Sequence, residues 1–218
     1  MLHEIRLVIA DDHPFFRRGL LEVIKEDPSL HVVGEATDGE QALAMIQTHQ
    51  PDVAVLDIDM PKLDGFAVAQ AIRDKHPTVA SIFLTYFKDE DIFNEALNLG
   101  AIGYVLKESA TAELIDCIKA VRAGRLFISS SLSHYLHHRH QRATALEKEK
   151  PGLQQLTPTE RQVLGKIAER KTNPQIASEM SISVRTVENH RSHICEKLDL
   201  HGPHALLTFA LEHKSELF

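Results

Sequence analysis

Short runs of Val, Ile and Leu alternate with segments of helical periodicity over residues 1–124. The apolar runs lie at Ile5–Ile9, His31–Gly34, Val53–Leu56, Ala80–Leu84 and Gly103–Leu106. The segments between them place apolar residues three or four positions apart, as at Leu114, Ile118 and Val121. Five strands alternating with five helices predict an α/β doubly wound, five-stranded parallel sheet covered on both faces.

Residues 153–218 contain no alternating stretch and predict a small all-α domain of four helices. Thr157 followed by Pro158 is typical of a helix start, and Ser183 is a second cap candidate. The short helix expected from Asn173 is followed by a tight turn and a longer helix. This order is that of a helix-turn-helix unit.

Residues 125–152 differ from both neighbours, and we interpret them as a linker that is helical in its first half and stopped by Pro151 and Gly152. Four histidines crowd this linker, at His134, His137, His138 and His140. Their spacing allows a Zn²⁺ or Ni²⁺ site, but a solvated basic linker is the favoured interpretation.

Length and charge support two domains with different partners. The 218 residues exceed one typical domain. Residues 1–124 carry a net charge of −10, residues 125–152 carry +3 and residues 153–218 carry 0. The acidic first part argues against nucleic-acid binding there, whereas five histidines can give the neutral helical part a basic face.

The sequence indicates a cytoplasmic protein with no membrane partner. No apolar run approaches the roughly 18 residues that a membrane-spanning helix needs, and no signal peptide is evident. The two cysteines, Cys117 and Cys195, form no disulfide framework and suit a reducing compartment. Cys195 is expected in a core rather than as a redox sensor.

Polar side chains follow four of the predicted strands, at the edge of the sheet where ligands bind in such folds. They are Asp11, Asp12, Asp57, Asp59, Thr85 and Lys107. Clustered carboxylates favour Mg²⁺, and a carboxylate beside that ion can attack phosphorus to give an acyl phosphate. Lys107 would neutralise a phosphoryl oxygen and Thr85 would donate a hydrogen bond to another.

We call this group of polar residues at the edge of the sheet the acidic rim. Two other interpretations of the acidic rim are weaker. Aspartates after strands can be solvated caps, which explains one pair but not the whole set. Asp57 and Asp59 form the Asp-x-Asp pair of a haloacid-dehalogenase-like phosphatase. That enzyme class fits poorly, because Asp11 and Asp12 come upstream and the helical domain would be unexplained. We therefore expect no enzyme.

The same residues resemble the receiver domain of bacterial response regulators. The matching runs are Ile9–His13, Leu56–Gly65, Leu84–Thr85 and Gly103–Lys107. The resemblance implies that a sensor histidine kinase phosphorylates Asp57. It implies that Asp12, Asp57 and the backbone carbonyl of Asp59 hold Mg²⁺, and that Asp11 supports the site.

The resemblance also implies a switch formed by Thr85 and Tyr104. Thr85 moves toward the phosphoryl group, and the ring of Tyr104 turns inward into the vacated space. Taken without the family, Tyr104 would be interpreted as a half-exposed strand residue.

The helical domain resembles the LuxR-type DNA-binding domain. The matching runs are Leu156–Arg161, Asn173–Ala177, Ser183–Ile194 and Lys197–Leu198. Together the two modules resemble the NarL/FixJ family of response regulators. The resemblance implies DNA contacts on the longer helix and pairing of two such domains through the last helix.

Helical spacing favours one face of the longer helix as the groove-reading face. If Val187, Ile194 and Leu198 face the core, the opposite face carries Arg185, Glu188, Asn189 and Ser192. Arg185 could then pair with guanine, Asn189 with adenine and Glu188 with cytosine. The flanking residues expected to contact phosphates are Thr186, His190, His193 and Lys197.

The sequence thus predicts a two-component transcription regulator. Phosphorylation of Asp57 would favour a homodimer that places two recognition helices on double-stranded DNA. The alternative is a phosphorylation-independent DNA-binding regulator that uses the receiver as a dimerisation scaffold.

Overall fold

The structure is a computed structural model that describes residues 4–217, and it divides into two compact units. The first unit runs to Tyr135 and the second begins at Leu136. The elements of the first unit are β1 (Ile5–Ala10), α1 (Pro14–Lys25), β2 (Leu30–Ala36), α2 (Gly39–His49), β3 (Val53–Leu56), α3 (Gly65–Lys75), β4 (Ala80–Thr85), α4 (Glu90–Asn98), β5 (Gly103–Leu106), η1 (Lys107–Ser109), α5 (Ala110–Arg122), β6 (Phe127–Ile128) and η2 (Ser130–Leu132).

The first unit is built on a parallel sheet whose strand order is β2-β1-β3-β4-β5-β6. The doubly wound fold predicted from the sequence is confirmed, but the expected count of five strands was one short. The sixth strand lies in the segment interpreted as linker. It forms because the N–H groups of Phe127 and Ser129 donate to the carbonyls of Ile102 and Tyr104, which continues the sheet beyond β5.

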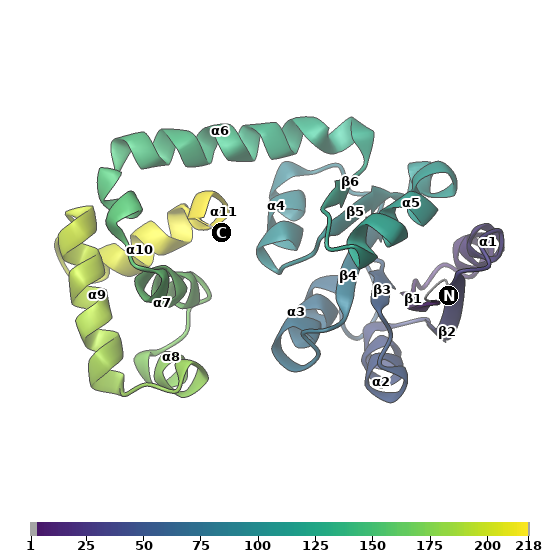
Figure 1. Ribbon diagram of the computed structural model, residues 1–218, viewed down its shortest axis with the longest axis horizontal. Helices are drawn as coiled ribbons and strands as arrows, with labels where there is room; N and C mark the ends of the chain where they lie inside the picture. The colour runs from purple at the N-terminus through teal and green to yellow at the C-terminus, as the bar shows by residue number, and fades with distance from the viewer. Residues whose placement is uncertain (1–3, 218) are drawn as a thin grey trace. The chain divides into compact units, whose positions relative to one another are not determined.

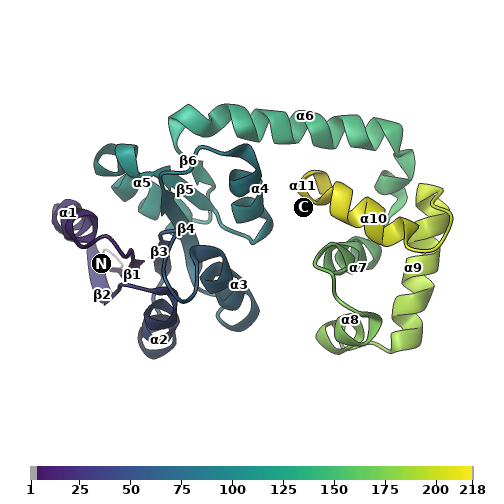
Figure 2. The same ribbon diagram turned by 180° about the vertical axis from the view of Figure 1, so that it is seen from behind.

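Helices cover both faces of this sheet, as Figures 1 and 2 show. One apolar core lies under α2, α3 and α4 and includes Ile46, Val68 and Phe93. The other lies under α1 and α5 and includes Ile24 and Leu114. Because the strands run parallel and Ala10 pairs with Leu56, the loops after β1 and β3 meet at one edge.

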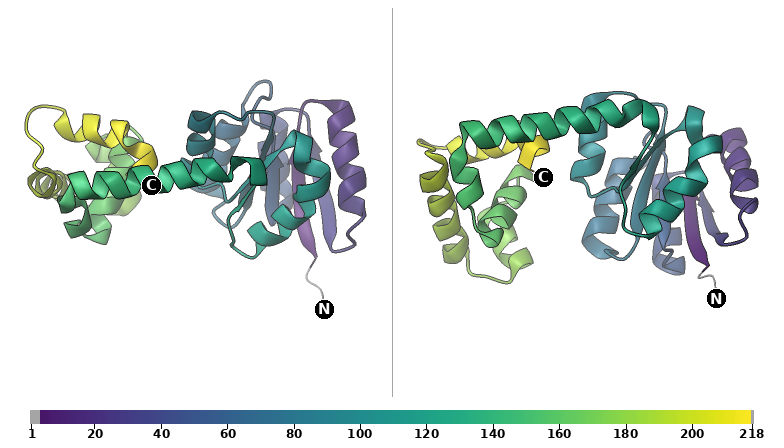
Figure 3. Two further views of the ribbon diagram at one scale, coloured as in Figure 1. Left: turned by 90° about the horizontal axis from the view of Figure 1, so that it is seen from above. Right: turned by 45° about the horizontal axis from the view of Figure 1, so that its top comes forward.

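The segment after α5 is pinned to the sheet before a helix begins. The buried hydroxyl of Ser129 donates to Glu113 of α5 and accepts from the N–H of Leu106, 3.0 Å away. The expected helix in the first half of residues 125–152 therefore begins only at Ser133 and continues well beyond that half. The helix is α6 (Ser133–Glu149), which follows η2 and ends just before Pro151. Figure 3 shows α6 from two directions.

The second unit is all-helical, as predicted. It continues through η3 (Pro151–Gln155), α7 (Pro158–Ala168), α8 (Asn173–Met180), α9 (Val184–Leu198), α10 (Ala205–Glu212) and α11 (Lys214–Leu217). The single turn of α11 adds a fifth helix to the four expected after residue 153. Thr157 caps α7 in a capping box with Glu160, and Ser183 caps α9 by accepting from the N–H of Thr186. One core joins α7, α8, α9 and α10.

Within residues 4–217, no helix is long and apolar enough to cross a membrane.

Candidate functional site

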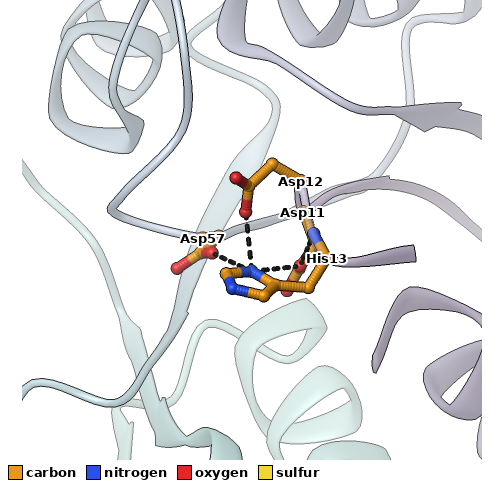
Figure 4. Close-up of side chains that lie close together, drawn as sticks. All are labelled: Asp11, Asp12, His13 and Asp57. Atoms are coloured by element: carbon orange, nitrogen blue, oxygen red, sulfur yellow. Dashed lines mark hydrogen bonds and ion pairs between the residues drawn. The ribbon is translucent and has the colours of Figure 1, made fainter. Parts of the chain in front are cut away.

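Three aspartates gather where β1 and β3 end. Asp11 and Asp57 are buried, Asp12 is half-buried, and one ligand atom from each lies within 4.8 Å of the others and of His13. The N–H of Asp57 donates to the carbonyl of Ala10 at 2.8 Å, which continues the β1–β3 pairing into the site. The sequence placed these carboxylates on one rim, and the fold brings them together (Figure 4).

Lys107 supplies the positive charge of this cluster. It begins η1 directly after β5, and its Nζ lies 2.6 Å from Oδ2 of Asp57 and 2.8 Å from Oδ2 of Asp11. Burial alone would lower the pKa of Lys107, but its hydrogen bonds to Asp11 and Asp57 outweigh burial and raise it. Burial raises the pKa of Asp57, with a further contribution from the charge of Asp11, although Lys107 opposes both.

Two aromatic rings cover the other side of the Lys107 ammonium group. The ring centroids of Phe16 and Tyr86 lie 4.9 Å and 5.2 Å from Nζ, within the range of a cation–π contact. The side chain of Lys107 is 1% exposed as a result. The site therefore opens to solvent on the side of Asp12 and His13 rather than on the side of Lys107.

His13 is a member of the cluster to which the sequence interpretation gave no role. Its Nδ1 lies 2.7 Å from Oδ1 of Asp12 and 3.9 Å from Oδ2 of Asp57, so the imidazole stands among the carboxylates in Figure 4. Its backbone N–H donates to Oδ1 of Asp11 at 2.8 Å. The signal in the sequence is its position directly after Asp12, which places it on the same turn.

The donor set fits a hard divalent cation. Oδ1 of Asp12 is buried and receives no well-aligned hydrogen bond from any residue in the described part of the chain. Clustered carboxylate oxygens that lack donors are the ligands Mg²⁺ prefers. The side chain of Asp59 is exposed and lies outside the cluster. The sequence prediction concerned the Asp59 carbonyl, which stays a prediction.

The loop after β3 also depends on Gly65. A Cβ atom at this position would lie 2.2 Å from the carbonyl oxygen of Asp57, so any larger residue would displace that backbone. The N–H of Gly65 donates to the carbonyl of Ile58 at 2.9 Å. The start of α3 therefore fixes the backbone that directly follows the Asp57 side chain.

Tyr104 and Thr85 meet at the loop between β4 and α4. The ring of Tyr104 is fully buried, so interpreting it as half-exposed would have been wrong. It packs edge-on against Phe93 at a centroid distance of 5.3 Å, and its hydroxyl donates to the carbonyl of Phe87 at 3.1 Å. Burial raises the pKa of Tyr104. Oγ1 of Thr85 accepts from the N–H of the same Phe87 at 3.2 Å.

Helix α9 presents the face that its spacing predicted. Val187, Ile194 and Leu198 are buried against the other helices of the second unit, as expected. The opposite positions are exposed; they are Arg185, Glu188, Asn189 and Ser192. Of the flanking residues, His193 is exposed, whereas Thr186, His190 and Lys197 are partly buried.

Lys197 has a partner that the sequence did not indicate. Its Nζ lies 2.7 Å from Oε2 of Glu160, the buried capping-box residue of α7. Nδ1 of His193 lies 3.9 Å from the other carboxylate oxygen of Glu160. This buried carboxylate therefore ties the end of α9 to the start of α7.

Within the described part of the chain, neither the four linker histidines nor Cys195 belongs to a second cluster of metal-binding side chains. The four histidines of the linker lie at exposed positions of α6. Among the described residues, the aspartate cluster is the one group of three or more side chains placed to hold a metal ion. Cys195 is partly buried against the core of the second unit, and burial raises the pKa of its thiol.

Comparisons with known proteins divide the chain into the same two modules. Residues 7–119 match the family model of the response regulator receiver domain. Residues 154–210 match that of bacterial regulatory proteins of the luxR family. The probable transcriptional regulatory protein NarL of Mycobacterium tuberculosis is 34% identical over 97% of this chain and 95% of its own length. The transcriptional activator DevR/DosR of the same organism is 34% identical over 96% and 95%.

Solved structures of response regulators are also similar to this chain over both modules. The RcsB response regulator of Salmonella typhimurium covers 94% of this chain and 98% of its own, with 26% identity and a TM-score of 0.60. An RcsB–DNA complex covers 94% and 97%, with 26% identity and a TM-score of 0.59. The chain belongs to the NarL/FixJ family of two-component response regulators, with a receiver domain followed by a LuxR-type DNA-binding domain.

Proposed function

We propose that this chain is a transcription regulator whose DNA binding is controlled by phosphorylation of Asp57. The observation that carries the proposal is the buried carboxylate of Asp57, with Lys107 Nζ at 2.6 Å and two further aspartates beside it. A buried carboxylate in such a charged cluster is suited to nucleophilic attack on phosphorus.

The chemical step transfers a phosphoryl group from a phosphohistidine of a sensor histidine kinase. A carboxylate oxygen of Asp57 attacks phosphorus, the P–N bond breaks, and its electron pair returns to the imidazole ring, leaving an acyl phosphate on Asp57. Lys107 stabilises the negative charge on the phosphoryl oxygens, because its ammonium group already faces Asp57.

Mg²⁺ is the cofactor that the acidic rim favours. Asp12, Asp57 and the backbone carbonyl of Asp59 would hold the ion, and Asp11 would support them. When bound, Mg²⁺ neutralises phosphoryl charge and orients the transferred group. His13 stands beside Asp12 with its side chain 58% exposed, so it can turn toward solvent and leave room at the rim.

Thr85 and Tyr104 would carry the state of Asp57 to the β4–α4 loop. Both already contact Phe87 of that loop, through its N–H and its carbonyl respectively. A Thr85 hydroxyl that turns to a phosphoryl oxygen gives up the N–H of Phe87, which changes the loop that Tyr104 also holds. A bias of a few kcal/mol between two loop arrangements is enough for a switch.

DNA binding would belong to α9. Its exposed residues Arg185, Glu188, Asn189 and Ser192 would face base edges in the major groove. Thr186, His190, His193 and Lys197 would lie along the phosphates. A homodimer of the phosphorylated chain would present two such helices to a symmetric site. RcsB, a response regulator of similar fold, has been solved in complex with DNA, which supports this assignment.

The test is intact mass spectrometry after incubation with a small phosphodonor and Mg²⁺. Wild type and Asp59→Asn should gain one phosphoryl group, whereas Asp57→Asn should gain none. Asp59 is the matched control because it lies two residues away and its exposed side chain is outside the cluster. An equal adduct on Asp57→Asn would exclude Asp57 as the acceptor. No adduct on any variant, from the phosphodonor or from kinase, would favour a phosphorylation-independent regulator.

A further inference from the structure

Arg17 is a partly buried arginine of α1 that reaches back to the acidic rim. Its Nη1 donates to the backbone carbonyl of Asp11 at 2.7 Å, and its side chain is 16% exposed. The carbonyl belongs to the peptide group between Asp11 and Asp12. Arg17 is therefore bonded to the backbone that joins the two rim aspartates, rather than to a carboxylate.

That peptide group sets the direction of the Asp12 side chain. A peptide is planar, so fixing its carbonyl also fixes the position from which the next residue leaves the chain. Asp11 has further anchors: its N–H donates to the carbonyl of Ala36, and its carboxylate contacts Lys107 and the N–H of His13. Asp12 is half-buried, and its carboxylate contacts the exposed imidazole of His13. The position of the Asp12 carboxylate therefore depends mainly on the backbone that carries it.

A second contact fixes the guanidinium group. Nε of Arg17 lies 3.5 Å from Oε2 of Glu35, near the end of β2. The planar guanidinium thus joins a strand end to the turn after β1, in a geometry that a lysine ammonium group reproduces only in part. The neighbouring Arg18 is exposed and has the same charge.

We propose that Arg17 is a positioning residue for the metal site, and this inference rests on the proposed function of that site. By holding the peptide between Asp11 and Asp12, Arg17 orients the Asp12 carboxylate for a divalent cation. Residues behind metal ligands typically account for roughly 10-fold or more in metal affinity.

The sign of the effect separates this role from simple electrostatics. Arg17 is a cation near a cation site, so removing its charge alone should tighten Mg²⁺ binding. If Arg17 orients Asp12, removing it should weaken binding instead. The two roles therefore predict opposite results for the same substitution.

The experiment measures divalent-cation affinity directly, by isothermal titration calorimetry with Mg²⁺ and by electron paramagnetic resonance with Mn²⁺. Arg17→Met should raise the dissociation constant roughly 10-fold, as is typical for such residues. Arg17→Lys should lie between wild type and Arg17→Met. Arg18→Met, which loses the same charge from an exposed position, should bind as wild type or slightly more tightly. Glu35→Gln should weaken binding less than Arg17→Met, in the same direction.

A parallel measurement varies Mg²⁺ during phosphorylation by a small phosphodonor. In Arg17→Met the half-saturating Mg²⁺ concentration should rise, while the rate at saturating Mg²⁺ stays near that of wild type. Binding of the cation by Arg17→Met as tight as by wild type, or tighter, would overturn the inference. If wild type binds Mg²⁺ but takes no phosphoryl group from the phosphodonor or from kinase, the proposed function fails, and the binding titrations still decide the role of Arg17.

Discussion

Lys107 stands between two buried carboxylates, so the three charges depend on one another. Its Nζ contacts both Asp11 and Asp57, and all three side chains are almost completely buried. Removing one partner from a buried ionic group leaves an uncompensated charge and costs about 3–5 kcal/mol. Lys107→Ala should therefore lower the free energy of unfolding of the first unit by about this amount in the absence of Mg²⁺.

Tyrosine fluorescence can follow this unfolding, because the three tyrosines of the chain, Tyr86, Tyr104 and Tyr135, lie in the first unit and the chain has no tryptophan. In Lys107→Ala/Asp57→Asn the loss should be smaller than the sum of the two single effects, since one of the buried charges is gone. Strict additivity of the two substitutions would contradict a shared cluster.

Glu160 makes the stability of the second unit depend on pH. Burial would raise the pKa of Glu160, but hydrogen bonds from Lys197 and Thr157 outweigh burial and lower it. A carboxyl with a lowered folded-state pKa stabilises the fold above its unfolded pKa, which is 4.5 here, and loses that contribution as pH falls further. Glu160→Gln should lower the stability of this unit by about 1.5 kcal/mol at pH 7.

The difference between wild type and Glu160→Gln should stay constant near neutral pH and shrink below pH 4.5. Thermal melts followed by far-UV circular dichroism measure it, with tyrosine fluorescence marking the transition of the first unit. His193 also faces Glu160, at 3.9 Å, so His193→Gln serves as the control for this second contact. A stability difference that does not change with pH would show that the carboxylate charge is irrelevant.

At the scale of elements, two tyrosines hold neighbouring carbonyls of the β4–α4 loop. Tyr104 donates to the carbonyl of Phe87, and Tyr135 from the first turn of α6 donates to that of Lys88. The ring of Tyr135 also contacts Phe93 at a centroid distance of 5.7 Å. The loop that Thr85 contacts is thus bonded to the beginning of α6.

Tyr135→Phe keeps the ring and removes only the hydroxyl group. It should cost about 1 kcal/mol and speed amide hydrogen exchange in the first turn of α6, because the bond to Lys88 is lost. Tyr86→Phe is the matched control, since Tyr86 is 62% exposed. Hydrogen exchange followed by mass spectrometry distinguishes Tyr135→Phe from this control. Equal exchange in wild type and Tyr135→Phe would mean that the hydroxyl does not anchor α6.

The elements that could be predicted are those with a local signal. Thr157 and Ser183 cap α7 and α9 through hydrogen bonds within three residues, so the sequence alone indicates both starts. The strand β6 could not be predicted, because two residues carry no periodicity and pair only once β5 is in place. The helix expected in that segment begins only at Ser133, because Ser129 binds residues more than ten positions away and is held at the sheet.

The residues of the candidate site also divide into those with a signal in the sequence and those without one. Asp57 and Lys107 were predictable because each follows an apolar strand, and parallel strands bring their ends together. Arg17 was not identified, and Glu160 was predicted only as the capping partner of Thr157, since a charged residue on a helix is usually solvated and only the fold reveals its distant partner. Tyr104 was placed by family resemblance, because its burial depends on packing against Phe93.

Across the whole molecule, the receiver part and the part that resembles a DNA-binding domain differ in net charge. The acidic first part, with a net charge of −10 over residues 1–124, contains the aspartate cluster proposed to bind Mg²⁺. The part that resembles a DNA-binding domain is neutral. If α9 binds DNA as proposed, affinity would depend more on the placement of α9 than on general attraction to phosphates, and a dimer controlled by phosphorylation would have a large effect on it.

If phosphorylation of Asp57 controls DNA binding, the DNA affinity of the full chain must depend on it. Duplexes selected from a random library with the phosphodonor-treated chain serve as probes, and fluorescence anisotropy gives Kd. With phosphodonor and Mg²⁺, wild type should bind roughly 10-fold more tightly than without, within the usual range of coupling between sites. Asp57→Asn should bind equally with and without phosphodonor. Identical Kd values for wild type under both conditions, with phosphorylation of Asp57 confirmed by mass spectrometry, would show that phosphorylation does not control DNA binding.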